Sequence, residues 1–111
     1  MEITRRTDYA VRILMKLAQV TDGRPVSARA LSDGEQVPYA FARSIQRDLA
    51  AAGLVTTTRG ASGGMTLARD PEDITLLQIV VAIQGEPSCS VCTSDPDWCG
   101  RRAGCRTHAV W

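Results

Sequence analysis

Four cysteines and a histidine crowd the end of this 111-residue chain, in the segment CSVCTSDPDWCGRRAGCRTHAVW. The cysteines are Cys89, Cys92, Cys99 and Cys105, and two residues separate the last of them from His108. Thiolates are soft ligands and imidazole is a borderline one, so this set suits zinc, Cu(I) or an iron–sulfur cluster. Structural zinc sites often use two C-x2-C pairs, whereas this pattern contains only one. On spacing alone, structural zinc is still the leading interpretation.

Whether these cysteines form disulfides depends on the cellular compartment of the protein. The opening residues MEITRRTDYAVRILMKLAQ mix charged and apolar side chains, and no stretch approaches the length of a membrane span. We therefore expect a cytoplasmic protein, in which structural disulfides are rare. A thioredoxin-like use of Cys89 and Cys92 would require a βαβ context, which the sequence does not predict.

The two parts of the chain differ slightly in net charge. The formal net charge is +1. Residues 1–70 carry 10 basic against 7 acidic side chains, and residues 71–111 carry 3 against 5, so the front is at +3 and the back at −2. Nearly all the basic residues are arginines, which suit phosphate and base contacts. Coding bias toward arginine explains the composition equally well.

The apolar spacing predicts helices in the first half. Residues 3–20 have the spacing of an amphipathic helix. Ser27 is placed to cap a short helix over residues 28–35, and Pro38 fits the first turn of a third helix that reaches about residue 52, before Gly53. The third helix is expected to turn one apolar face to the core: Phe41, Ile45, Leu49 and Ala52. Two short helices joined by a tight turn are the elements of a helix-turn-helix.

A hairpin and a further helix follow. Residues 54–58 and 65–68 are expected to be strands on either side of the turn sequence RGASGG. Thr75 and Gln78 have the spacing of a capping box for a helix that ends at Gly85. The apolar positions of that helix are Leu76, Leu77, Ile79, Val80 and Ile83. The expected fold is mainly α: a winged helix-turn-helix with a two-stranded wing over residues 1–85, a cysteine-rich loop over 86–105, and a helix start over 106–111.

A winged helix-turn-helix presents its second motif helix to the major groove and its hairpin to the minor groove or the backbone. Arg59 stands among glycines, on a slim backbone that suits a narrow groove. Ser44, Asp48 and Thr57 are expected to be exposed beside the main candidates. The residues predicted to contact DNA are Tyr9, Pro38, Tyr39, Ala40, Arg43, Arg47, Arg59 and Ser62. A solvated basic face on a winged helix used for protein contacts is the alternative.

Several phrases of the chain resemble one known family. They are the opening ITRRTDYAVR, the piece AAGLV, the wing RGASGG, the phrase ITLLQIVVAIQG and the ending CRTHAVW. Together they resemble the iron–sulfur winged-helix transcription regulators of the IscR and NsrR type, the Rrf2 family, over nearly the whole chain. The ending is the most specific phrase and is most similar to the IscR branch.

The resemblance implies a homodimer on a palindromic or pseudopalindromic operator. It implies a cluster, 2Fe–2S in the first instance with 4Fe–4S as the alternative, held by Cys92, Cys99 and Cys105. In the IscR branch the fourth ligand falls on His108, and in a nitric-oxide-sensing branch it falls on Asp8 of the partner subunit. Cys89 has no counterpart in the pattern.

The chain departs from the family pattern at three points, which affect what we expect of it. Six residues separate the first two ligands where five are usual, although longer gaps occur in the family. Gln36 stands where a turn glycine is usual and Gly34 lies earlier, so we expect the preceding helix to end early. The family's long dimerisation helix would follow Trp111, so we expect this 111-residue form to dimerise weakly.

The leading interpretation is a DNA-binding transcription regulator, a repressor rather than an enzyme, whose operator binding is controlled by an iron–sulfur cluster. A winged-helix regulator with structural zinc and a small dithiol redox protein are the alternatives. A cluster protein purified without air is brown, whereas the other two are colourless.

Overall fold

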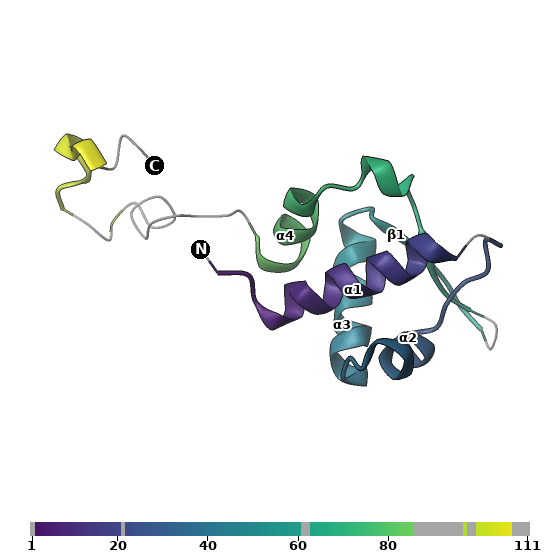
Figure 1. Ribbon diagram of the computed structural model, residues 1–111. Helices are drawn as coiled ribbons and strands as arrows, with labels where there is room; N and C mark the ends of the chain where they lie inside the picture. Colours follow the sequence, from purple (N-terminus) through teal and green to yellow (C-terminus); the bar gives the residue numbers. More distant parts are fainter. Residues whose placement is uncertain (1, 21, 61–62, 86–96, 98–99, 108–111) are drawn as a thin grey trace.

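The computed structural model describes residues 2–20, 22–60, 63–85, 97 and 100–107. It is mainly helical, with one two-stranded antiparallel sheet (Figure 1). In chain order the elements are α1 (Arg5–Gln19), α2 (Ala28–Glu35), α3 (Tyr39–Ala51), β1 (Val55–Thr58), β2 (Gly64–Leu67), the 3₁₀ turn η1 (Pro71–Asp73), α4 (Leu76–Gln84) and the 3₁₀ turn η2 (Arg102–Gly104). The predicted winged helix-turn-helix is confirmed. None of the described helices is long and apolar enough to cross a membrane.

Side-chain caps explain where the helices begin. Thr4 has extended backbone angles and accepts a hydrogen bond from the backbone N–H of Thr7, so α1 begins two residues later than predicted. Ser27 caps α2 in the same way. Thr75 and Gln78 form the predicted capping box at the start of α4. Pro38 is the N-cap of α3 rather than a residue of its first turn.

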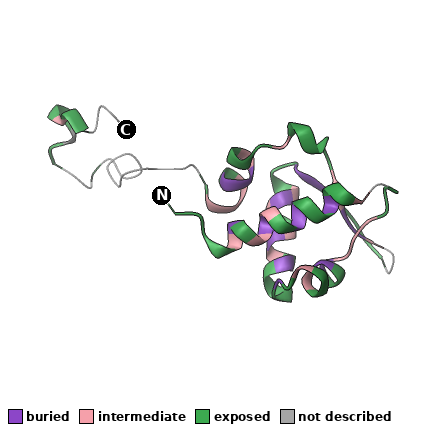
Figure 2. Ribbon diagram, viewed as in Figure 1, coloured by how far each residue is buried: buried purple, intermediate pink, exposed green. Residues whose placement is uncertain are grey.

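The core lies where α1 and α3 face each other, with α2, α4 and the sheet around them (Figure 2). Its members are Ala10, Ile13, Leu14, Leu17, Ala28, Leu31, Val37, Ala42, Ile45, Leu49, Leu54, Val55, Met65 and Ile79. Burial of this apolar surface is the main stabilising contribution to the fold.

The apolar face predicted for α3 is wrong at both ends. Phe41 is 42% exposed, and Ala42 is completely buried in its place. The buried positions of α3 are Ala42, Ile45 and Leu49, so the face that packs on the core begins one residue later. Ala52 caps the end of the helix and is exposed.

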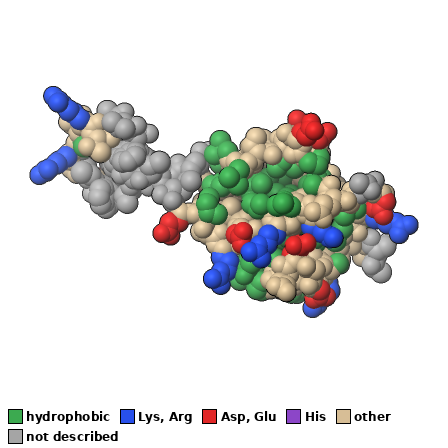
Figure 3. Space-filling model, in the orientation of Figure 1, with side chains coloured by type: hydrophobic (Ala, Val, Ile, Leu, Met, Phe, Trp, Pro, Cys, Tyr) green, Lys and Arg blue, Asp and Glu red, His purple; other side chains and the backbone are tan. Residues whose placement is uncertain are grey.

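Two apolar positions predicted for α4 are also not core positions. Leu76 is 60% exposed and Leu77 is 59% exposed, whereas Ile79 and Val80 are buried. Figure 3 shows hydrophobic side chains gathered over α4 and the neighbouring part of α1. α4 therefore turns one apolar face to the core and another to the surface.

The turn between α2 and α3 uses a left-handed residue. Gln36 has φ 55° and ψ 42°, and its N–H donates to the carbonyl oxygen of Ser32. The expectation that α2 ends early is wrong, because the helix runs to Glu35 with Gly34 inside it. Gln36 is the non-glycine residue with positive φ among the described residues. A backbone conformation that glycine would adopt without strain is thus forced on glutamine.

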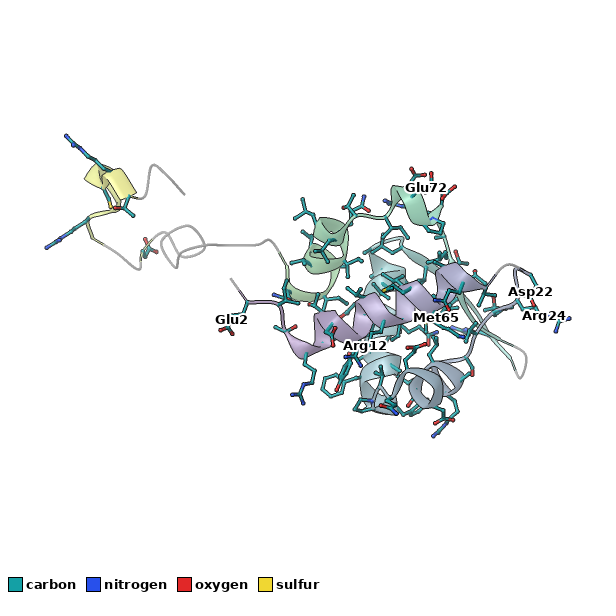
Figure 4. All side chains as sticks on the ribbon, viewed as in Figure 1. Glu2, Arg12, Asp22, Arg24, Met65 and Glu72 are labelled. Atoms are coloured by element: carbon teal, nitrogen blue, oxygen red, sulfur yellow. The ribbon has the colours of Figure 1, made fainter. Side chains whose placement is uncertain are left out.

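The wing pairs β1 with β2, from Val55 opposite Leu67 to Thr58 opposite Gly64. Each strand starts or ends one residue away from the predicted position. An isolated bridge joins Val26 to Met65, which is completely buried and is labelled in Figure 4. This bridge, which was not predicted, connects the wing to the residues preceding α2.

The predicted cysteine-rich loop and terminal helix lie mostly outside the described residues. Within them, η2 precedes Cys105, and Arg106 and Thr107 are helical. The rest of the predicted helix, residues 108–111, is not described.

Candidate nucleic-acid interface

A groove of about 580 Å³ lies between the helix-turn-helix and the wing. Helices α2 and α3 and both strands contribute to it. It is lined by Ser27, Ala28, Arg29, Tyr39, Arg43, Gln46, Arg47, Ala50, Thr57, Thr58, Arg59, Gly60, Gly63 and Gly64. Among the described residues that line it, four are arginines and none is acidic.

Within the described residues no acidic side chain pairs with these four arginines, whereas Arg6, Arg12 and Arg24 each make an ion pair. A concave surface with charge of one sign focuses its field on the space in front of it. The groove is therefore electropositive and suits a polyanion.

The second motif helix, α3, places most of the predicted contact residues in or beside the groove. Tyr39, Arg43 and Arg47 line it, and all three side chains are exposed. Pro38 and Ala40 are exposed at the start of the helix but are not among the lining residues. The N-terminal half of α3 is thus free to meet a ligand.

Ser44 and Asp48 do not belong to this exposed set, which corrects the prediction for them. Nη2 of Arg6 donates to the hydroxyl of Ser44 at 2.6 Å and to the carboxylate of Asp48. Both acceptors are half-buried. These residues hold α3 against α1 instead of facing the groove.

Tyr9 lies on α1, outside the groove lining. Its ring contacts that of Phe41 edge to face, with centroids 5.7 Å apart. Aromatic pairs of this geometry stabilise the contact between two elements beyond the area they bury. Tyr9 therefore supports the start of α3.

Glycines shape the turn at the tip of the wing. A Cβ atom on Gly63 would lie 2.1 Å from the carbonyl oxygen of Thr58, and Gly60 has φ 106°. Only glycine fits both positions without strain. Arg59 is exposed next to this turn and lines the groove. Ser62, the other predicted wing contact, lies outside the described residues.

Arg29, Gln46 and Ser27 also line the groove, although they were not among the residues predicted to contact DNA. Arg29 lies in the first turn of α2, and its guanidinium carbon is 4.0 Å from the ring centroid of Tyr39. The signal in the sequence was a basic residue after the Ser27 cap. Which way that side chain points depends on the angle between α2 and α3, which local pattern does not give.

A chain of hydrogen bonds joins α4, α1 and α3 behind the groove. Gln84, at the end of α4, accepts from the hydroxyl of Thr7 at 2.6 Å and from the backbone N–H of Thr4 at 3.0 Å. Arg6, next to Thr7 on α1, binds Ser44 and Asp48 of α3. The helix that leads into the cysteine segment is thus connected to the helix that faces the groove.

The predicted cluster ligands are mostly beyond the described residues. Cys89, Cys92, Cys99 and His108 are not described, and Cys105 is half-buried. Asp8 lies exposed on α1, with one carboxylate oxygen 3.0 Å from Nη2 of Arg12. Within the described residues no three metal-ligating side chains come together. By chemistry, three thiolates with an imidazole or carboxylate fit an iron–sulfur cluster.

The fold and the electropositive groove define a winged helix-turn-helix transcription regulator. Residues 3–111 match the Rrf2 family, described as iron-dependent transcriptional regulators. The chain belongs to this family, whose members are regulators and not enzymes.

Relatives and solved structures agree with this. The chain is 31% identical over 111 residues to protein rrf2 of Nitratidesulfovibrio vulgaris, covering 100% of this chain and 74% of the relative. It is 35% identical over 107 residues to the repressor NsrR of Streptomyces coelicolor, covering 96% and 72%. The T. potens IscR structure superposes with a TM-score of 0.69 at 30% identity, covering 85% of this chain and 70% of that one.

Proposed function

We propose that this chain binds duplex operator DNA through the groove between α3 and the wing, under the control of an iron–sulfur cluster. The observation that carries the DNA part is the cluster of four arginines in one groove, for which the described part of the chain offers no acidic partner. Phosphate contacts dominate the affinity of such interfaces, and base contacts in the grooves specify the sequence.

The fold supports one way of docking on DNA. The N-terminal half of α3 enters the major groove, where Tyr39, Ala40, Arg43 and Arg47 reach base edges and phosphates and Pro38 sets the start of the helix. The wing approaches the adjacent minor groove with Arg59 and Ser62. Tyr9 acts from α1 by supporting Phe41.

Titration of the metal-replete protein against duplex DNA tests this proposal. A duplex selected by the protein from a random pool is the probe, with a scrambled duplex of equal length as the control. We expect tighter binding to the selected duplex and a steep decrease of affinity with salt. Absence of binding to any duplex at low salt would remove the proposal.

We propose Cys92, Cys99 and Cys105 as cluster ligands with His108 as the fourth, and Asp8 as the alternative fourth ligand. The support is the soft donor set, the family's description as iron-dependent, and relatives named IscR and NsrR. A 2Fe–2S cluster is favoured over 4Fe–4S. When bound, the cluster supplies a redox- and nitric-oxide-sensitive group. The hydrogen bonds of Gln84 and Arg6 connect the helix before the ligand segment to α3.

Purification without air tests the cofactor. We expect a brown protein with iron, acid-labile sulfide and visible absorption. A colourless protein with one zinc per chain would support the structural-zinc alternative, and a colourless metal-free protein with a reversible Cys89–Cys92 disulfide would support the redox alternative.

We propose a homodimer in which the exposed apolar face of α4 meets a second copy. Leu76, Leu77 and Val81 are exposed on this face, and Figure 3 shows hydrophobic side chains gathered over α4. A palindromic operator requires two-fold symmetry, and residues 106–111 are proposed as the start of the helix that pairs the copies. Sedimentation velocity tests the proposed homodimer: a dimer supports it, and a monomer at all concentrations contradicts it.

A regulator of this kind works where the chromosome is, so we also propose a cytoplasmic location.

A further inference from the structure

Arg29 and Tyr39 form a pair that bridges the two helices of the helix-turn-helix. The guanidinium carbon of Arg29 lies 4.0 Å from the ring centroid of Tyr39, and both side chains line the groove. Arg29 makes no ion pair and no side-chain hydrogen bond within the described residues. Its donors are therefore not used by another protein group in this part of the chain.

Stacking on an aromatic face has a defined consequence for an arginine. The ring holds the plane of the guanidinium group, while the N–H donors at its edge remain available. A long side chain held in one conformation loses less entropy when it binds a phosphate than a freely rotating one. Tyr39 thus pre-organises Arg29 before any ligand arrives.

The position of Arg29 favours a backbone contact over a base contact. It lies on α2, and the first helix of a helix-turn-helix crosses the DNA backbone while the second helix enters the major groove. A planar guanidinium group matches the oxygens of a phosphate in a bidentate way.

We propose that Arg29 is a DNA phosphate contact that Tyr39 holds in position, so that Tyr39 contributes to affinity partly through Arg29. This rests on the proposed function, since it assumes that the groove binds duplex DNA. It adds α2 to the interface predicted on α3 and the wing.

The test uses the full chain with the selected duplex and a scrambled duplex of the same length, at several salt concentrations. We expect Arg29→Ala to weaken binding to both duplexes by a similar factor, about 5- to 20-fold, and to make the slope of log K against log salt shallower by about 0.9. Arg24→Ala is the matched control, because Arg24 pairs with Asp22 and lines a separate groove between the end of α1 and β2. It should leave both affinities unchanged.

A double-mutant cycle tests the role of the ring. If Tyr39 acts through Arg29, removing Arg29 should cost much less in a Tyr39→Leu background than in the wild type. Additive losses would overturn the positioning role. A loss confined to the selected duplex would make Arg29 a base contact, and unchanged binding would remove it from the interface; either result overturns the proposal.

Failure of the inference can be told from failure of the proposed function. Wild-type binding, together with its loss in Arg59→Ala, reports on the groove as a DNA site. If both are seen while Arg29→Ala is inert, the groove remains the site and only the role of Arg29 is wrong. Thermal unfolding by circular dichroism confirms that each variant is folded.

Discussion

The amide oxygen of Gln84 accepts a hydrogen bond at 2.6 Å from the hydroxyl of Thr7, a completely buried polar residue in the first turn of α1. The amide nitrogen of the same side chain donates to the backbone carbonyl of Glu2 at 2.9 Å. One side chain therefore fastens the end of α4 to the start of α1. Since the next residues lead to the cysteines, this contact lies between the proposed sensor and the proposed DNA interface.

Replacing Gln84 by alanine should lower the free energy of unfolding by about 0.5–1.5 kcal/mol, because the buried hydroxyl of Thr7 loses its 2.6 Å hydrogen bond and keeps the longer contact with the hydroxyl of Thr4, at 3.2 Å. Urea unfolding followed by circular dichroism measures this. Gln19→Ala, at the exposed end of α1, is the control and should change stability by less than about 0.5 kcal/mol. Equal effects of the two substitutions would show that the Gln84 contact contributes nothing specific.

Arg59→Ala should weaken binding to the selected duplex by about 1–3 kcal/mol if this residue reads a minor groove. The exposed position of Arg59 beside the slim glycine turn is the reason. Fluorescence anisotropy on duplexes with altered minor-groove sequence measures the effect, with Arg24→Ala as control. A loss that is uniform across all sequences would identify a phosphate contact instead.

Gln36→Gly should raise stability by about 1 kcal/mol, because glycine adopts the left-handed conformation between α2 and α3 without the Cβ conflict. The midpoint of urea unfolding measures this. Gln19→Gly, in the right-handed last turn of α1, should do the reverse and lower stability. If Gln36→Gly is destabilising, the side chain of Gln36 contributes more than its backbone conformation costs.

Gly64 and Gly34 should respond to alanine in opposite directions. A Cβ atom on Gly64 would lie 2.4 Å from the backbone of Val26, so Gly64→Ala must separate the wing from the residues before α2, and we expect a loss of stability of more than about 2 kcal/mol. Gly34 lies inside α2, and a Cβ atom there would have no neighbour within 4 Å beyond the adjoining turns of the helix, so Gly34→Ala should stabilise by about 0.5–1 kcal/mol. Thermal melts of the two variants compare them directly. Similar melting temperatures would contradict the close packing at Gly64.

The elements of this fold could be predicted from local signals. The Ser27 cap, the Thr75–Gln78 capping box and the glycine-rich turn set where α2, α4 and the wing begin and end. Such signals act over a few residues, so they are readable in the chain itself.

Side-chain directions that depend on packing could not be predicted in the same way. Phe41 is as apolar as a core residue, yet it packs at the surface against Tyr9, and Ala42 takes the buried position. Asp48 has the helical spacing of the residues of α3 that were predicted to face the groove, yet it forms an ion pair with Arg6 of α1. Arg29 reaches Tyr39 only because α2 and α3 meet at a particular angle. Each of these depends on a partner distant in sequence or on the angle between two helices.

The fourth cluster ligand gives the last prediction. A non-cysteine ligand is exchanged more readily than a thiolate, and histidine can also be lost by protonation, which suits a sensor. His108 follows Cys105 closely in sequence, whereas Asp8 lies on α1 in an ion pair with Arg12 and would have to be delivered from another part of the fold or from a partner subunit.

We therefore expect Cys92→Ala, Cys99→Ala and Cys105→Ala each to abolish the visible absorption of anaerobically purified protein, and Cys89→Ala to leave it in place. His108→Ala should retain a cluster with a shifted spectrum and a faster loss in air. Asp8→Ala is the matched comparison, with its thermal melt recorded because it also removes the partner of Arg12. If Asp8→Ala shifts the spectrum while His108→Ala changes nothing, the carboxylate is the ligand and the assignment to His108 is wrong. If only Cys89→Ala joins the other three cysteines in abolishing absorption, four thiolates hold the cluster.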